Sequence, residues 1–106
     1  MINAKQEYLE HVKGLGPVSC AKITVGDPEY SWIESRDYIL KVGFTAEEEQ
    51  AFIDSLDFEY DAGFGGQELF GTIWFSGGTW SDRDEYDGSE WWSHNSRPEV
   101  PKELYK

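Results

Sequence analysis

The C-terminal half of the chain consists of short apolar runs joined by two-residue turns that contain glycine. The runs are residues 68–76, 79–86 and 89–94, and the turns are Gly77-Gly78 and Asp87-Gly88. Dipeptides of this kind between apolar runs are the strongest short-range signal for β-hairpins. Two successive hairpins give three antiparallel strands, so we expect a β-meander from Gln67 to His94.

Residues 57–92 also concentrate the aromatic side chains, with 10 of the 17 aromatic residues and 7 of the 11 glycines. Asp57–Asp61 alternates strictly between acids and aromatics, which predicts a strand with its acids on one face. The run 68–76 has large apolar residues at both parities, such as Ile73 and Trp74. This pattern predicts a central strand that is covered on both sides.

Two helices are expected before this region. Asn3 can cap a first helix that ends at Gly14, with Tyr8 on its apolar face. Thr45 and Glu48 form a capping box at the start of a second helix, whose buried stripe is Phe52, Ile53 and Leu56. Glu47–Glu49 lie in its first turn, where the helix dipole favours negative charge, so these acids have a structural explanation.

The remaining sequence predicts strands and a single domain. Val18–Val25 is an extended run, and Tyr30–Glu34 and Tyr38–Val42 are expected to be two further strands. In an alternative interpretation, Pro28 begins a short helix that ends at Glu34. The fold class is therefore α+β, with two helices packed on a mainly antiparallel sheet of six or seven strands. Residues 1–106 form one domain, and 102–106 are expected to be a loose tail.

The charge balance limits the class of partner. The chain has 21 acidic and 9 basic residues, a net charge of −12. Such a protein repels phosphate, so neither direct nucleic-acid binding nor an anionic membrane surface is expected. Cys20 is the single cysteine, and the N-terminus has no apolar signal region, so a reducing cytoplasm is expected. The acidity suits a basic protein surface, although solubility alone also explains it.

Two groups of carboxylates are candidates for contact with such a partner. Residues two apart on a strand share a face and lie about 6.5–7 Å apart, so these acids form short rows of negative charge. A basic nucleic-acid-binding groove accepts a row of this kind in place of phosphates. Of the adjacent Trp91 and Trp92, one is expected to be exposed and to anchor the contact. The candidate partner-binding residues are Asp57, Glu59, Asp61, Asp82, Asp84, Glu85, Asp87, Glu90, Trp91 and Trp92.

Other chemistries have weaker signals in this sequence. Asp82–Gly88 resembles a calcium loop, but its third acid and its glycine come one place late and position 12 is Ser93. A carbohydrate-binding or virion-associated module that uses Trp80, Trp91 and Trp92 remains an alternative. His11 and His94 have no neighbouring catalytic motif. We therefore expect no enzyme activity, no catalytic residue, no metal and no cofactor.

The C-terminal half resembles small acidic proteins encoded by tailed bacteriophages and prophages. The resemblance rests on the segments 67–75, 78–81, 85–92 and 98–101, which form a pattern of strands and turns. It implies a bacterial host cytoplasm and an accessory role, such as that of anti-CRISPR or anti-restriction inhibitors. The expected function is that of a non-enzymatic inhibitor, a possible nucleic-acid mimic, that docks on a basic site of a host defence protein or ribonucleoprotein. A small structural protein with a solubilising surface is the remaining alternative.

Overall fold

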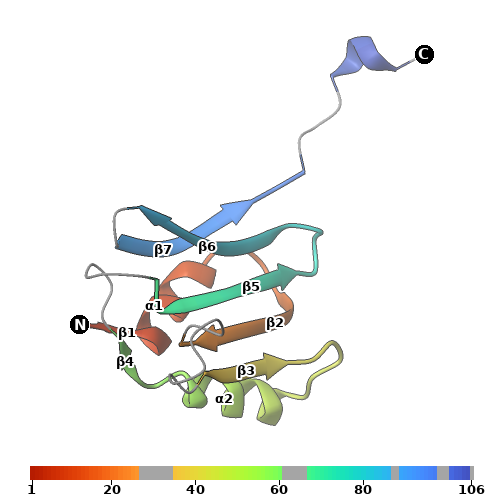
Figure 1. Cartoon of the computed structure of the whole chain (residues 1–106). Helices are drawn as coiled ribbons and strands as arrows, with labels where there is room; N and C mark the ends of the chain where they lie inside the picture. Colours follow the sequence, from red (N-terminus) through yellow and green to blue (C-terminus); the bar gives the residue numbers. More distant parts are fainter. Residues whose placement is uncertain (27–34, 61–66, 87–88, 98–100, 106) are drawn as a thin grey trace.

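The computed structural model describes residues 1–26, 35–60, 67–86, 89–97 and 101–105 (Figure 1). The helices are α1 (Ala4–Val12), α2 (Ala46–Ser55) and the 3-10 turn η1 (Lys102–Leu104). The strands are β1 (Ile2–Asn3), β2 (Val18–Val25), β3 (Arg36–Leu40), β4 (Glu59–Tyr60), β5 (Leu69–Phe75), β6 (Trp80–Tyr86) and β7 (Ser89–Asn95).

Two antiparallel sheets make up the strand layer. Five strands form the larger sheet in the order β3-β2-β5-β6-β7, and β1 pairs with β4 in a separate two-stranded sheet. Figure 1 shows α1 behind the larger sheet and α2 beside β3. The α+β class and the C-terminal meander β5-β6-β7 are thus confirmed, whereas a single sheet of six or seven strands is wrong for the described chain. In this part of the chain, no helix has the length and apolar character needed to cross a membrane.

Both helices begin at the predicted caps. The Asn3 side chain accepts a hydrogen bond from the backbone N–H of Gln6 at 3.0 Å. The Thr45 hydroxyl accepts one from the Glu48 N–H at 3.1 Å, and the Glu48 carboxylate accepts one from the Thr45 N–H at 3.0 Å. These bonds satisfy N–H groups that the first helical turn leaves free. Because they depend on residues close in the sequence, the start of each helix can be predicted from the sequence.

The observed strand boundaries agree with the predicted ones for some strands only. β2 has the predicted bounds, but β3 begins at Arg36, two residues before the predicted Tyr38. The reason is pairing, because Arg36 and Asp37 lie opposite Val25 and Thr24, and Thr24 Oγ1 donates to Asp37 at 2.8 Å. Of the predicted Asp57–Asp61 strand, Glu59 and Tyr60 form β4, Asp57 and Phe58 lie outside it, and Asp61 is not among the described residues. The predicted strand or helix within residues 28–34 and the predicted loop at 62–66 lie outside the described residues.

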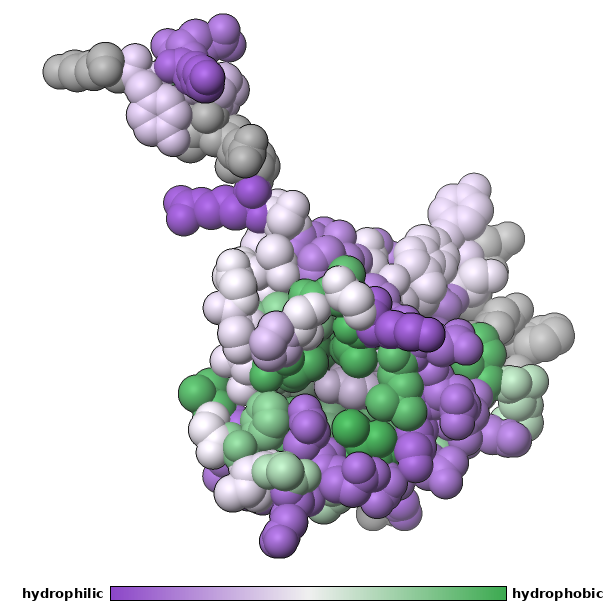
Figure 2. Space-filling view, turned by 180° about the vertical axis from the view of Figure 1, so that it is seen from behind, coloured by the Kyte–Doolittle hydropathy of each residue, from purple (hydrophilic) through white to green (hydrophobic). Residues whose placement is uncertain are grey.

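The core lies between the larger sheet and the helices. Tyr8 of α1 and Phe52 of α2 meet edge to face with ring centroids 5.7 Å apart, and both belong to the same buried core as Ile73 of β5. Burial, aided by the charge of Glu49, raises the pKa of Tyr8 to about 12. Figure 2 views the molecule from behind, and green side chains gather in its centre. Leu9 of α1 is still 37% exposed, so the apolar face of this helix is only partly covered.

Gly71 is expected to be the least replaceable glycine that the structure describes. Its φ is +154°, and a Cβ placed there would lie 2.5 Å from the backbone oxygen of Lys22 on the neighbouring strand β2. Because backbone cannot yield as a side chain can, Gly71→Ala should lower the free energy of unfolding by about 1–3 kcal/mol in urea denaturation. The control is Gly77→Ala, where a Cβ meets nothing within 4 Å. Equal stability of the two variants would refute this explanation.

Candidate functional site

The larger sheet has one face toward α1 and one face away from it. Ser81 and Arg83 of β6 and Trp92 of β7 face α1, because they contact its residues His11 and Glu7. Alternation along each strand therefore directs their neighbours to the opposite side. We call this opposite side the open face. On β5, β6 and β7 it carries the outward side chains Phe70, Thr72, Trp74, Trp80, Asp82, Asp84, Tyr86, Ser89, Trp91, Ser93 and Asn95. On β2, the exposed Lys22 lies opposite Thr72 on the same face.

Aromatic side chains dominate the open face. Trp74 is 45% exposed and Trp91 is 42% exposed, although each lies within a strand of the sheet. Trp74 lies directly opposite Trp80 on β6. The prediction that β5 is covered on both sides is wrong in this respect, since no described helix packs over Trp74. An exposed group of large aromatic residues is unusual for an isolated surface and is typical of a binding site.

Two carboxylates stand among these aromatic rings. Asp82 and Asp84 share the outward parity of β6, and Asp84 lies directly opposite Trp91. Asn95 Nδ2 donates to Asp82 at 3.1 Å, which holds that carboxylate in place. Asp82 lies between paired residues of β5 and β7, whereas Asp84 lies on the part of β6 that pairs with β7 alone. The face therefore combines negative charge with flat apolar surface.

Three of the predicted contact residues lie on the other side. Glu90 is 5% exposed and Trp92 is 7% exposed, and both belong to the interior beneath α1. Glu85 is exposed, but it lies opposite Glu90. Its side chain is therefore directed to the same face as Glu90, and Asp84 is directed to the open face. Alternation places Glu90 and Trp92 beside Arg83, so neither of these predicted contact residues is exposed on the open face. Trp91 is the exposed one of the two adjacent tryptophans.

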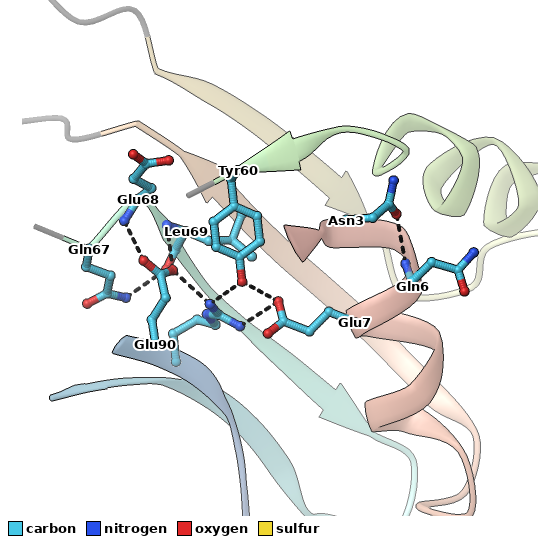
Figure 3. A network of polar contacts seen from close by, with 9 residues as sticks. Asn3, Gln6, Glu7, Tyr60, Gln67, Glu68, Leu69 and Glu90 are labelled. Carbon is cyan, nitrogen blue, oxygen red and sulfur yellow. Dashed lines mark hydrogen bonds and ion pairs between the residues drawn. The ribbon is translucent and has the colours of Figure 1, made fainter. Parts of the chain in front are cut away.

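The buried Glu90 belongs to a polar network around Arg83 (Figure 3). Arg83 Nη2 donates to Glu90 Oε1 at 2.7 Å, and Arg83 Nη1 donates to Glu7 at 3.1 Å. The side chains of Arg83 and Glu90 are 1% and 0% exposed. Glu90 also accepts the backbone N–H groups of Glu68 and Leu69, at 2.8 and 2.9 Å. This carboxylate ties the start of β5 to β7.

Tyr60 extends the same network to β4. Its hydroxyl donates to Glu7 at 2.5 Å and accepts from Arg83 Nη2 at 2.9 Å. Burial, followed by the bond to Glu7, raises the pKa of Tyr60 above its usual range. Burial alone would lower the pKa of Arg83, but the bond to Glu90 and the charge of Glu7 raise it overall. The guanidinium therefore stays charged, and the network is structural.

A second internal cluster joins two histidines through a serine. Ser81 Oγ lies 2.7 Å from His11 Nε2 and 3.0 Å from His94 Nδ1. Burial lowers the pKa of His11, as do the charges of His94 and Arg83. In nucleophilic catalysis, a histidine in contact with a serine acts as the base that activates its hydroxyl. Ser81 is fully buried, however, whereas His94 is exposed, so the hydroxyl in this arrangement lies away from solvent.

The other predicted acids are separate from the open face or undescribed. Asp57 is exposed and accepts from Asn3 Nδ2 at 3.0 Å, and Glu59 is exposed on β4 in the smaller sheet. Asp61 and Asp87 lie outside the described residues. Within the described ranges, no group of three or more His, Cys, Asp or Glu side chains is placed to hold a metal ion. Asp82 and Asp84 are thus the predicted acids that gather with exposed aromatic residues.

No protein-family model, curated protein or solved structure matches this chain. The geometry of the chain itself is therefore the basis for a functional proposal.

Sequence reasoning missed three features of this site. The sequence pattern predicts a strand covered on both sides at Trp74, which is the most exposed tryptophan of the described chain. Arg83 received no role, yet it is the one basic residue among nine acids in residues 57–92, which is a signal of a buried counter-ion. His11 and Ser81 are 70 positions apart in the sequence, so no local pattern predicts their contact.

Proposed function

We propose that this chain is a non-enzymatic binding protein that docks its open face on a basic, nucleic-acid-binding surface of another protein and blocks it. One observation carries the proposal: Asp82 and Asp84 lie beside Trp74 and Trp91 on a sheet face over which no described helix packs. A basic partner surface is complementary to this combination and to the net charge of −12.

The chemistry of recognition follows from the two kinds of side chain. Carboxylates form charge-assisted hydrogen bonds with Lys and Arg, and these are about twice as strong as neutral ones. The faces of Trp74 and Trp91 attract the same cations through their ring electrons. Because Asp82 and Asp84 lie two residues apart on a rigid strand, they present a short repeat of negative charge, as a nucleic-acid backbone does.

The origin and partner of the protein belong to the same proposal. The resemblance to phage-encoded acidic proteins supports a partner in a bacterial defence complex, of the CRISPR or restriction type, and a site of action in the host cytoplasm. The carbohydrate-binding alternative depended on Trp80, Trp91 and Trp92, and it loses Trp92 to the interior. A surface that serves solubility alone does not account for two half-exposed tryptophans.

The proposal is tested by affinity capture from bacterial lysate, with the purified captured protein then challenged by duplex DNA and by salt. Binding is expected to be lost as DNA is added and to fall steeply with rising ionic strength, because opposed charges carry it. Carbohydrate stacking would respond little to either. If DNA fails to displace the partner, or nothing is captured by the protein, the proposed function is wrong.

A further inference from the structure

A groove runs between the edge strand β3 and the helix α2. Its volume is about 500 Å³. One wall is the continuous run Asp37–Lys41, and the other is formed by Glu48, Ala51, Phe52 and Ser55. The four helical residues recur at intervals of three and four positions, so they belong to one face of α2. The groove thus has a strand for one side and a helix for the other.

The strand that forms this wall has an unpaired edge in the described chain. β3 is the terminal strand of the larger sheet and pairs with β2 alone through residues 36–40. Alternate residues of such an edge direct N–H and C=O groups outward, where an extended backbone can pair with them. Five residues of strand span about 17 Å, which is the length of a five-residue extended peptide.

The side chains of the groove indicate what such a peptide would carry. Its floor is apolar, since Leu40 and Phe52 are 3% and 5% exposed, and Ile39 on the rim is 54% exposed. The rim also holds two exposed carboxylates, Asp37 and Glu48, against one cation, Lys41. An apolar residue suits the floor, and a neighbouring Lys or Arg suits the negative rim and the strongly acidic protein.

We infer that the groove binds an extended peptide of another protein, which adds to β3 as a further strand. The peptide would place an apolar side chain over Leu40 and Phe52 and a basic one beside Asp37 or Glu48. This interface is independent of the proposed function, because β3 lies at the opposite end of the strand order from β6 and β7. The chain would then have two docking surfaces of different kinds.

The test begins with the selection of seven-residue peptides from a random displayed library on the purified full chain. Enriched peptides are expected to pair an apolar with a basic residue and to shift the backbone amide NMR signals of residues 36–41. Ala51→Arg should weaken their binding by at least about tenfold, because it places bulk and positive charge in the groove. Gln50→Arg is the matched control, as an exposed neighbour on α2 that does not line the groove.

Strand addition has its own diagnostic. N-methylation of alternate peptide amides should abolish binding in one of the two registers, because it removes the hydrogen bonds to the β3 edge. The variant Asp82→Lys/Asp84→Lys changes the open face and leaves the groove intact, so it should bind the peptides as tightly as the wild type does. This result distinguishes the peptide groove from the docking surface of the proposed function. The inference is overturned if no peptide is enriched, if Ala51→Arg binds unchanged, or if sedimentation shows that a second copy already occupies β3.

Discussion

Replacement of Arg83 by methionine is expected to destabilise the protein by about 3–5 kcal/mol. The change removes the cation that contacts Glu90 and Glu7 at 2.7 and 3.1 Å. The Glu90 side chain is 0% exposed, so its charge would remain away from water without a counter-ion, held by the backbone N–H groups of Glu68 and Leu69. Urea denaturation followed by far-ultraviolet circular dichroism measures the free energy of unfolding.

Two further variants separate the buried charge from a general loss of contacts. Arg83→Met/Glu90→Gln should be more stable than Arg83→Met, since the orphaned charge is gone. Lys5→Met removes the exposed pair between Lys5 and Asp54, whose side chains are 24% and 56% exposed, and should change stability far less than Arg83→Met, because water screens the pair. A loss below about 1 kcal/mol for Arg83→Met would show that the network does not support the fold.

The adjacent tryptophans Trp91 and Trp92 are expected to respond in opposite ways to alanine substitution. Trp92→Ala should destabilise the protein by about 3–5 kcal/mol, because the ring is 7% exposed. The Arg83 guanidinium lies 5.0 Å above that ring, and His11 stacks on it at 6.0 Å. Trp91→Ala should change stability by less than about 1 kcal/mol, because the 42% exposed ring projects from the open face.

The same urea titration measures both tryptophan variants, with circular dichroism as the signal because the substitutions alter fluorescence. Trp74→Ala, on the open face like Trp91, should also have a small effect on stability. Comparable losses for Trp91→Ala and Trp92→Ala would mean that the open face is covered by other parts of the chain. The surface would then be unavailable for a partner.

The sequence predicted those parts of the fold that local chemistry determines. Asn3 and Thr45 each satisfy free N–H groups within three residues, so both helix starts were evident. The pairing of Tyr86 with Ser89 confirms the second hairpin of the meander. The first hairpin also forms, but its loop has three residues, 76–78, and not the predicted two, because the Phe75 N–H donates to Thr79 and Trp74 lies opposite Trp80. These signals act over a few residues and need no knowledge of the tertiary structure.

The candidate site was harder to predict, because the position of a residue along its strand decides which face of the sheet its side chain lies on. Trp91 and Trp92 are both apolar, so alternation requires one outward ring without saying which. The sequence pattern predicts Glu90 as a surface acid, but Arg83 supplies its counter-ion and the N–H groups of Glu68 and Leu69 donate hydrogen bonds to it. A carboxylate becomes an interior residue only when such partners are supplied, and they come from elsewhere in the chain.

The most direct measurement of the central claim compares three forms of the protein in the capture and DNA-competition experiment. Asp82→Lys/Asp84→Lys reverses the charge of the open face, and Glu10→Lys/Glu47→Lys makes the same change in net charge at exposed helix positions. The wild type and the helix variant should both bind one basic protein that duplex DNA displaces, and the open-face variant should not bind it. Equal binding by all three forms, or equal loss in both variants, would contradict the claim that the open face is the docking surface.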